Sequence, residues 1–240
     1  MNIQSRIEEY VARLEPGKIF TYQDLPAYEV SPASTIKTIG RLVKSGQIRR
    51  FTKGNFYRPK QGVLGEMRPA DSEKINTLLF SGGKRLGYIT GLSLYNRMGL
   101  TTQVPKTVTI ATSRSRQKKN FGNIDVKLVP AKAPITEKNK ELLEILDAIT
   151  DIKIIPDSRP SETLRRLNDK LKCLESNSVN KLINLAKEYY PPATRALLGF
   201  MLNSVGMSDN NELLKTLNPT TRYKIGLNGF FPKAKEWKIE

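Results

Sequence analysis

Side chains suited to catalysis are sparse in this sequence. The chain has no histidine, the residue that most often acts as a general base and that activates serine or cysteine nucleophiles. Triad hydrolysis is therefore excluded, and the usual zinc-ligand sets cannot be assembled with one cysteine, Cys173. That cysteine has no partner for an internal disulfide. It lies in an apolar periodic stretch from Leu167 to Leu174, so we expect it in the core.

Two fragments look catalytic at first sight. Ser81 to Lys84 resembles a phosphate-binding loop, but the earlier glycine is missing and Arg85 stands where serine or threonine is required. A helix, not a strand, is expected before it. Asp157, Glu236 and Lys238 are the residue types of a metal-dependent nuclease, yet they are far apart in sequence and nothing places them together. We therefore expect no catalytic residues, no metal and no cofactor.

The charge of the chain points to a polyanionic partner. Forty lysines and arginines against 23 acidic residues give a formal charge of +17 and a pI of about 9.9. Residues 1–60 carry 11 basic and 5 acidic side chains, residues 61–136 carry 12 and 4, and residues 137–240 carry 17 and 14. No apolar run approaches the ~20 residues of a transmembrane helix, and the N-terminus has no signal-peptide core. We expect a cytoplasmic protein that binds nucleic acid and no membrane.

The first 30 residues predict two helices. Apolar residues recur at helical spacing from Ile3 to Leu14, and Pro16-Gly17 ends that helix. Thr21 followed three residues later by Asp24 resembles a capping box, which opens a short second helix that Pro26 is expected to limit.

A third helix and a hairpin follow. Ser31 and Pro32 open the helix, which ends near Gly46 and carries an apolar stripe made of Ile36, Ile39, Leu42 and Val43. The β-rich runs 48–51 and 56–58 are joined by the turn 52–55. Three helices and a hairpin predict a winged helix-turn-helix over residues 1–60.

The remainder, residues 61–240, is expected to form a larger domain with a small β-sheet and a helical C-terminal part. Helices are predicted over 71–80 and 92–100, strands around 108–110 and 124–128, and a basic loop over 112–120. Further helical stripes lie at 142–149, 164–174, 179–186 and 196–201. The fold class is therefore α+β.

The third helix carries the strongest functional pattern. One of its faces is polar and cationic, which suits a helix that enters the DNA major groove, and the hairpin continues the positive charge. A solvated surface helix is the alternative. The predicted DNA-binding residues are Ser34, Lys37, Thr38, Arg41 and Lys44 on the helix, and Arg49, Arg50, Lys53 and Arg58 on the wing. A possible second nucleic-acid contact, or else a flexible solvated loop, contains Arg114, Arg116, Lys118 and Lys119.

The segment from Tyr88 to Pro105, running into a strand over 107–111, resembles the AbiEi family of antitoxins of type IV toxin-antitoxin systems. The resemblance covers roughly residues 1–200. It implies that the winged helix binds inverted repeats in its own promoter and represses the operon. It also implies a nucleotidyltransferase-like toxin, encoded just downstream, that the protein counters directly or indirectly.

The sequence thus predicts a DNA-binding autorepressor and antitoxin that is not an enzyme. Two alternatives stay open: a nucleic-acid-processing enzyme that docks through the winged helix, and a transcription regulator whose C-terminal domain senses a ligand. A metal-dependent cleavage assay would identify the enzyme. A nucleotidyltransferase in the neighbouring reading frame would favour the antitoxin.

Overall fold

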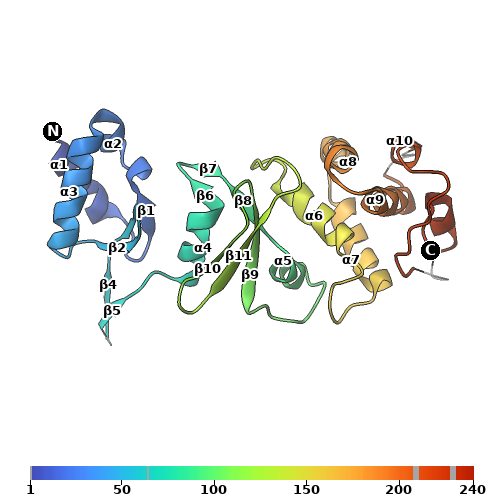
Figure 1. Cartoon of the computed structure of the whole chain (residues 1–240), viewed down its shortest axis with the longest axis horizontal. Coiled ribbons are helices and arrows are strands. Elements are labelled where there is room, and N and C mark those ends of the chain that lie inside the picture. The colour runs from blue at the N-terminus through green and yellow to red at the C-terminus, as the bar shows by residue number, and fades with distance from the viewer. Residues whose placement is uncertain (1, 64, 208–210, 228–230) are drawn as a thin grey trace. The chain divides into compact units, whose positions relative to one another are not determined.

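The computed structural model describes residues 2–63, 65–207, 211–227 and 231–240 and is of mixed α+β class (Figure 1). Two compact units divide it, Met1–Leu86 and Gly87–Glu240. The sequence placed a boundary after residue 60, whereas this division falls after Leu86. Packing within the first unit explains the difference, because the helix 71–79 lies against the strand 19–21, where Glu73 accepts a hydrogen bond from the Ile19 backbone N–H (3.1 Å).

The first unit alternates short helices and strands. Its elements are α1 (Ile3–Arg13), β1 (Ile19–Thr21), the 3-10 helix η1 (Tyr22–Asp24), α2 (Pro26–Val30), α3 (Pro32–Lys44), β2 (Arg49–Thr52), β3 (Asn55–Tyr57), β4 (Lys60–Gly62), β5 (Gly65–Met67), α4 (Asp71–Leu79), β6 (Phe80–Ser81) and β7 (Lys84–Arg85). Its core is one apolar cluster in which α1, α3 and the strands meet, with Ile7, Phe20, Ile39, Ile48 and Phe56 almost fully buried.

A three-stranded antiparallel sheet closes this core. Its order is β1-β3-β2, and β2 and β3 form the expected hairpin around Lys53-Gly54. Gly54 has a positive φ of 79°, which a residue without a Cβ adopts at little cost. The pairing of β1 with β3 was not predicted from the sequence.

Two short motifs of this unit have structures that the sequence described only in part. The capping box is present, since the Thr21 backbone N–H donates to Asp24 Oδ2 (2.7 Å), and it opens the short 3-10 helix η1, which ends before Pro26 as expected. Pro26 also begins a further helix, α2, which was not predicted. Proline suits the first helical position because its missing N–H would have no partner there. Gly82 and Gly83, both with positive φ, form the two-residue turn between β6 and β7. The phosphate-loop-like fragment is thus a β-hairpin.

The second unit is a sheet followed by helices. Its elements are β8 (Gly87–Thr90), α5 (Leu92–Arg97), β9 (Thr107–Thr112), β10 (Gln117–Asn120), β11 (Asp125–Pro130), α6 (Lys140–Thr150), α7 (Pro160–Lys172), α8 (Ser176–Tyr189), α9 (Pro192–Ser204), α10 (Asn211–Lys215) and the 3-10 helix η2 (Pro232–Trp237). The sheet order is β10-β11-β9-β8, with β9 and β11 parallel and the other pairs antiparallel.

The basic loop expected over 112–120 is present in part: residues 113–116 lie outside strands, whereas 117–120 form strand β10. Lys118 and Lys119 lie in this edge strand, which pairs with β11. The turn between the two strands is held by Asn120, whose side chain donates to Asp125 Oδ1 (2.7 Å) and accepts from the Gly122 N–H (2.9 Å). Local polar bonds therefore organise a segment whose composition alone indicated a loop.

The helices of the second unit share one large core. Leu146, Leu164, Leu182 and Leu198, from four successive helices, are each completely buried. Cys173 is exposed, contrary to the expectation that it is core. It follows α7, whose buried face contains Leu164, Leu167 and Leu171, and a residue two positions later points away from that face.

Candidate nucleic-acid interface

The exposed face of α3 is cationic. Lys37, Arg41 and Lys44 are exposed along it, and among the described residues none of the three has a carboxylate within ion-pair distance. Ser34 is exposed near the start of the helix, and its hydroxyl oxygen accepts a hydrogen bond from Ser31 (3.0 Å). Four of the five helix residues predicted to bind DNA therefore do lie on one open face.

The prediction that Thr38 binds DNA is wrong, because Thr38 faces the core. Its exposure is only 6%, and it lies in the buried stripe formed with Thr35, Ile39 and Leu42. These residues are spaced at i, i+3, i+4 and i+7, which is one helix face. Ile36, which the sequence placed in the core, is 47% exposed on the other side. Two small threonines fill the inner positions, so the helix is rotated relative to the expected apolar stripe.

Arg49 and Arg58 have partners within the protein. Arg49 forms an ion pair with Glu66 (3.0 Å), and its Nε also donates to that carboxylate. Arg58 Nη1 donates to the backbone carbonyls of Ala12 (2.7 Å) and Leu14 (3.1 Å), at the end of α1. Helix C-termini leave carbonyls without intrahelical partners, which cations satisfy well. The structure therefore gives both arginines a role in the fold.

Two cations of the hairpin are available to a partner molecule. Arg50 and Lys53 are exposed, and neither pairs with a carboxylate in the described part of the chain. The guanidinium of Arg50 lies 5.8 Å from the ring centroid of Phe56. Phe56 and Tyr57 are buried, so these aromatics pack inside the unit. Burial, and then the charge of Glu66, raise the pKa of Tyr57.

The second predicted contact lies in the other unit. Arg114, Arg116 and Lys118 are exposed before and within β10, and Lys119 is half-buried. Lys118 lies opposite Lys127 of β11, so like charges face each other across these two strands. Strand pairing with β11 therefore fixes the positions of Lys118 and Lys119, whereas Arg114 and Arg116 lie in the loop that precedes β10.

One buried carboxylate of the second unit, that of Asp147, accepts hydrogen bonds from four side chains. Asp147 Oδ2 accepts from Tyr88 Oη (2.9 Å) and Thr90 Oγ1 (2.7 Å). Its Oδ1 accepts from Lys132 Nζ (2.9 Å) and Tyr190 Oη (3.2 Å). Burial, and then the Asp147 charge, raise the pKa of Tyr88 and of Tyr190 far above its usual range. These bonds join the sheet to α6 and α8, and the network holds the unit together.

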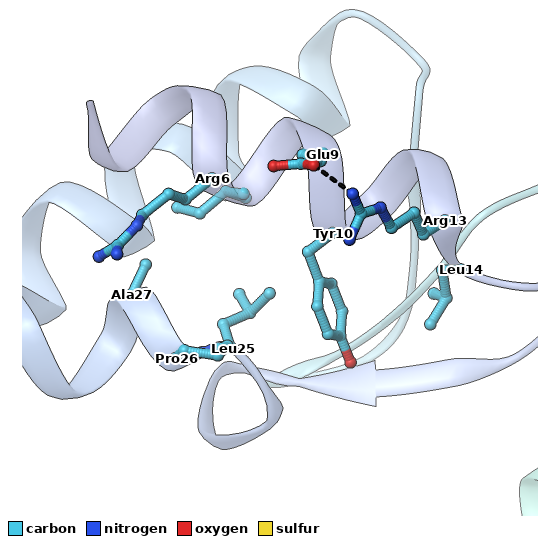
Figure 2. A pocket seen from close by; sticks show the side chains of 9 residues that line it. Arg6, Glu9, Tyr10, Arg13, Leu14, Leu25, Pro26 and Ala27 are labelled. Atoms are coloured by element: carbon cyan, nitrogen blue, oxygen red, sulfur yellow. Dashed lines mark hydrogen bonds and ion pairs between the residues drawn. The ribbon is translucent and has the colours of Figure 1, made fainter. Parts of the chain in front are cut away.

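Other arrangements for chemistry are few in the part of the chain that the structure describes. It contains no group of three acidic, cysteine or histidine residues able to hold a metal ion, and none of its helices is long and apolar enough to span a membrane. A hollow of about 570 Å³ lies between α1 and α2. Figure 2 shows Leu25 facing the α1 side chains across it, with the Glu9–Arg13 ion pair on one side. Its walls are mostly apolar.

The fold and this site define a basic α+β protein with an open cationic helix face. Residues 6–155 match the model of a family described as a family of unknown function (DUF6088), and the chain belongs to that family. No curated protein matches it. A solved structure titled "Crystal structure of RV2827C protein from Mycobacterium tuberculosis" is similar at 14% identity and a TM-score of 0.49, covering 99% of this chain and 90% of that one.

Proposed function

We propose that the first unit contains a winged helix-turn-helix that binds double-stranded DNA, and that the protein represses its own promoter. The order of α1, β1, α2, α3, β2 and β3, with the sheet order β1-β3-β2, supports this arrangement. The observation that carries the proposal is the face of α3, where three exposed cations lie and pair with no acidic side chain of the described residues.

In this proposal α3 enters the major groove, as recognition helices do. Arg41 reaches base edges, where a guanidinium can donate two hydrogen bonds to guanine. Lys53, at the hairpin turn, meets phosphate and positions the protein on the duplex. Arg49 and Arg58 stabilise the domain through their bonds to Glu66 and to the α1 carbonyls, and the exposed Arg50 and Lys53 contact the DNA in their place.

We further propose the antitoxin role that the resemblance of residues 88–105 to the AbiEi family implies. The partner is then a nucleotidyltransferase-like toxin encoded next to this gene, which the second unit counters directly or indirectly. Both roles place the protein in the cytoplasm, where promoter and toxin are found.

A titration of DNA tests the binding proposal. The full-length protein is titrated with the duplex upstream of its own gene and with a shuffled duplex of the same composition, at several salt concentrations. Arg41→Ala should weaken specific binding by about 1 to 3 kcal/mol and reduce discrimination between the two duplexes. Lys53→Ala should weaken both equally and reduce the salt slope by about one.

Arg6→Ala is the matched control, since Arg6 is an exposed arginine on α1 and its loss changes the net charge equally. It should retain discrimination. Equal wild-type affinity for upstream and shuffled DNA would contradict the repressor proposal, and discrimination that survives in Arg41→Ala would show that Arg41 does not read sequence.

Co-expression tests the antitoxin role. The neighbouring reading frame should encode a nucleotidyltransferase that arrests growth, and both the wild type and Arg41→Ala should restore growth, because repression and neutralisation use different units. Failure of the folded wild type to protect would refute the antitoxin role. Metal-dependent cleavage of the bound DNA would instead favour the nuclease alternative.

A further inference from the structure

The cationic face of α3 contains an apolar side chain that the core does not use. Ile36 is 47% exposed, one residue before Lys37 and five before Arg41. It lies in the N-terminal half of the helix, which is the half that contacts base edges when a recognition helix enters the major groove. Isolated exposed apolar residues are common on protein surfaces, so its neighbours decide what it can do.

Gly40 is the informative neighbour, four residues after Ile36 and on the same side of the helix. Glycine is less favourable than alanine inside a helix. Gly40 has no positive φ that would require glycine, and a Cβ built there meets no atom within 4 Å. Neither backbone conformation nor packing in the described chain accounts for it. A remaining use of glycine is to let another molecule approach the backbone closely.

We propose that the DNA duplex approaches α3 most closely at Gly40 and that Ile36 there packs against the methyl group of a thymine in the major groove. The inference rests on the proposed DNA-binding function and names what this face reads. The thymine C5-methyl is the apolar group that the major-groove edges of the bases present. Lys37 and Arg41 supply attraction and hydrogen bonds on one side of the helix face, and Ile36 supplies the apolar contact on the other.

The test begins with duplexes selected from a random library by the full-length protein. Each thymine of the selected duplex is then replaced in turn by deoxyuridine, which lacks only the methyl group. At the contacted position wild-type affinity should fall about fourfold, which corresponds to the ~0.8 kcal/mol of burying one methyl group. Ile36→Ala should bind the thymine and deoxyuridine duplexes equally.

Gly40→Leu tests the close approach, with Ala12→Leu as the control because Ala12 is exposed on α1. Both variants place a leucine at a helix position that is not buried, since Gly40 is half-buried and Ala12 is exposed. Gly40→Leu should keep or raise the melting temperature while it weakens binding to the selected duplex at least tenfold, and Ala12→Leu should bind as the wild type does.

Two kinds of failure are distinguishable. If the wild type selects no sequence and binds all duplexes alike, the proposed function itself fails. If it selects a duplex but every deoxyuridine position affects wild type and Ile36→Ala equally, or if Gly40→Leu binds normally, this inference is overturned and the repressor proposal stands. A change in oligomeric state of Ile36→Ala without loss of thymine discrimination would also overturn it.

Discussion

Replacing Asp147 by alanine should destabilise the second unit strongly. The carboxylate has 6% of its side chain exposed and accepts hydrogen bonds from four donors. Breaking a buried charge pair costs about 3 to 5 kcal/mol, because the partner keeps its charge without compensation. Lys132 is 37% exposed, so water partly solvates its ammonium group and the lower end applies. We expect a loss of about 3 kcal/mol, or roughly 10 °C in melting temperature for a unit of this size.

The chain supplies its own reporter for this measurement. Trp237 is the sole tryptophan and is buried in the second unit, so its fluorescence follows urea unfolding of that unit. Asp169→Ala removes an acidic side chain that is 75% exposed and should leave the midpoint unchanged. Asp147→Asn should fall between the two, since its amide can donate to the Tyr88 and Thr90 hydroxyls while its oxygen faces Lys132.

A small effect would refute this reasoning. If Asp147→Ala unfolds within about 1 kcal/mol of the wild type, the four donors find other partners or water without cost, and the carboxylate does not join the sheet to the helices.

Three further outcomes are expected. Arg58→Ala should cost the first unit about 1 to 2 kcal/mol, seen as faster hydrogen exchange in α1, because the carbonyls of Ala12 and Leu14 lose their donor, whereas Arg41→Ala should leave exchange unchanged. Gly199→Ala should destabilise the second unit by about 1 to 3 kcal/mol and shift tryptophan emission to the red, because the new methyl group would overlap the Trp237 ring. The control Asn203→Ala, on the exposed side of α9, should do neither. Burial raises the pKa of Tyr88, Tyr95 and Tyr190, so the stability that they contribute is complete below their unfolded pKa of about 10. Above that pH the free energy of unfolding should fall by about 1.4 kcal/mol per pH unit for each tyrosine. If Tyr95→Phe leaves this slope of unfolding free energy against pH unchanged, Tyr95 ionises freely in the folded protein.

The helices were largely predictable from the sequence, because their apolar residues recur over several turns. The stripes expected at 142–149, 179–186 and 196–201 lie in helices of the structure, and the stripe at 164–174 lies in α7 except for its last two residues, which follow that helix. The short strands were harder. Strands β1 and β8 have three and four residues, too few for alternation to show, and β10 is so rich in charge that its pairing with β11 cannot be recognised locally.

The candidate site was predictable in part, because charge can be counted but partners cannot. Arg58 and the α1 carbonyls are more than 40 residues apart, and Arg49 is 17 residues from Glu66, so their bonds depend on the fold. The sequence predicted Thr38 as exposed and Ile36 as buried, and the structure shows the reverse for a different reason. Hydrophobicity placed isoleucine inside, whereas the helix rotation is set by the total packing of α3 against α1 and α2.

The cations of β10 have a consequence for solubility. The outer edge of this strand offers backbone N–H and C=O groups to which a strand of another molecule can add, and natural sheets discourage such aggregation by placing lysines there. Lys118 and Lys119 therefore protect the sheet whether or not they contact nucleic acid. Variants that neutralise them should be checked for monodispersity by light scattering, because self-association through the bared edge would imitate a loss of binding.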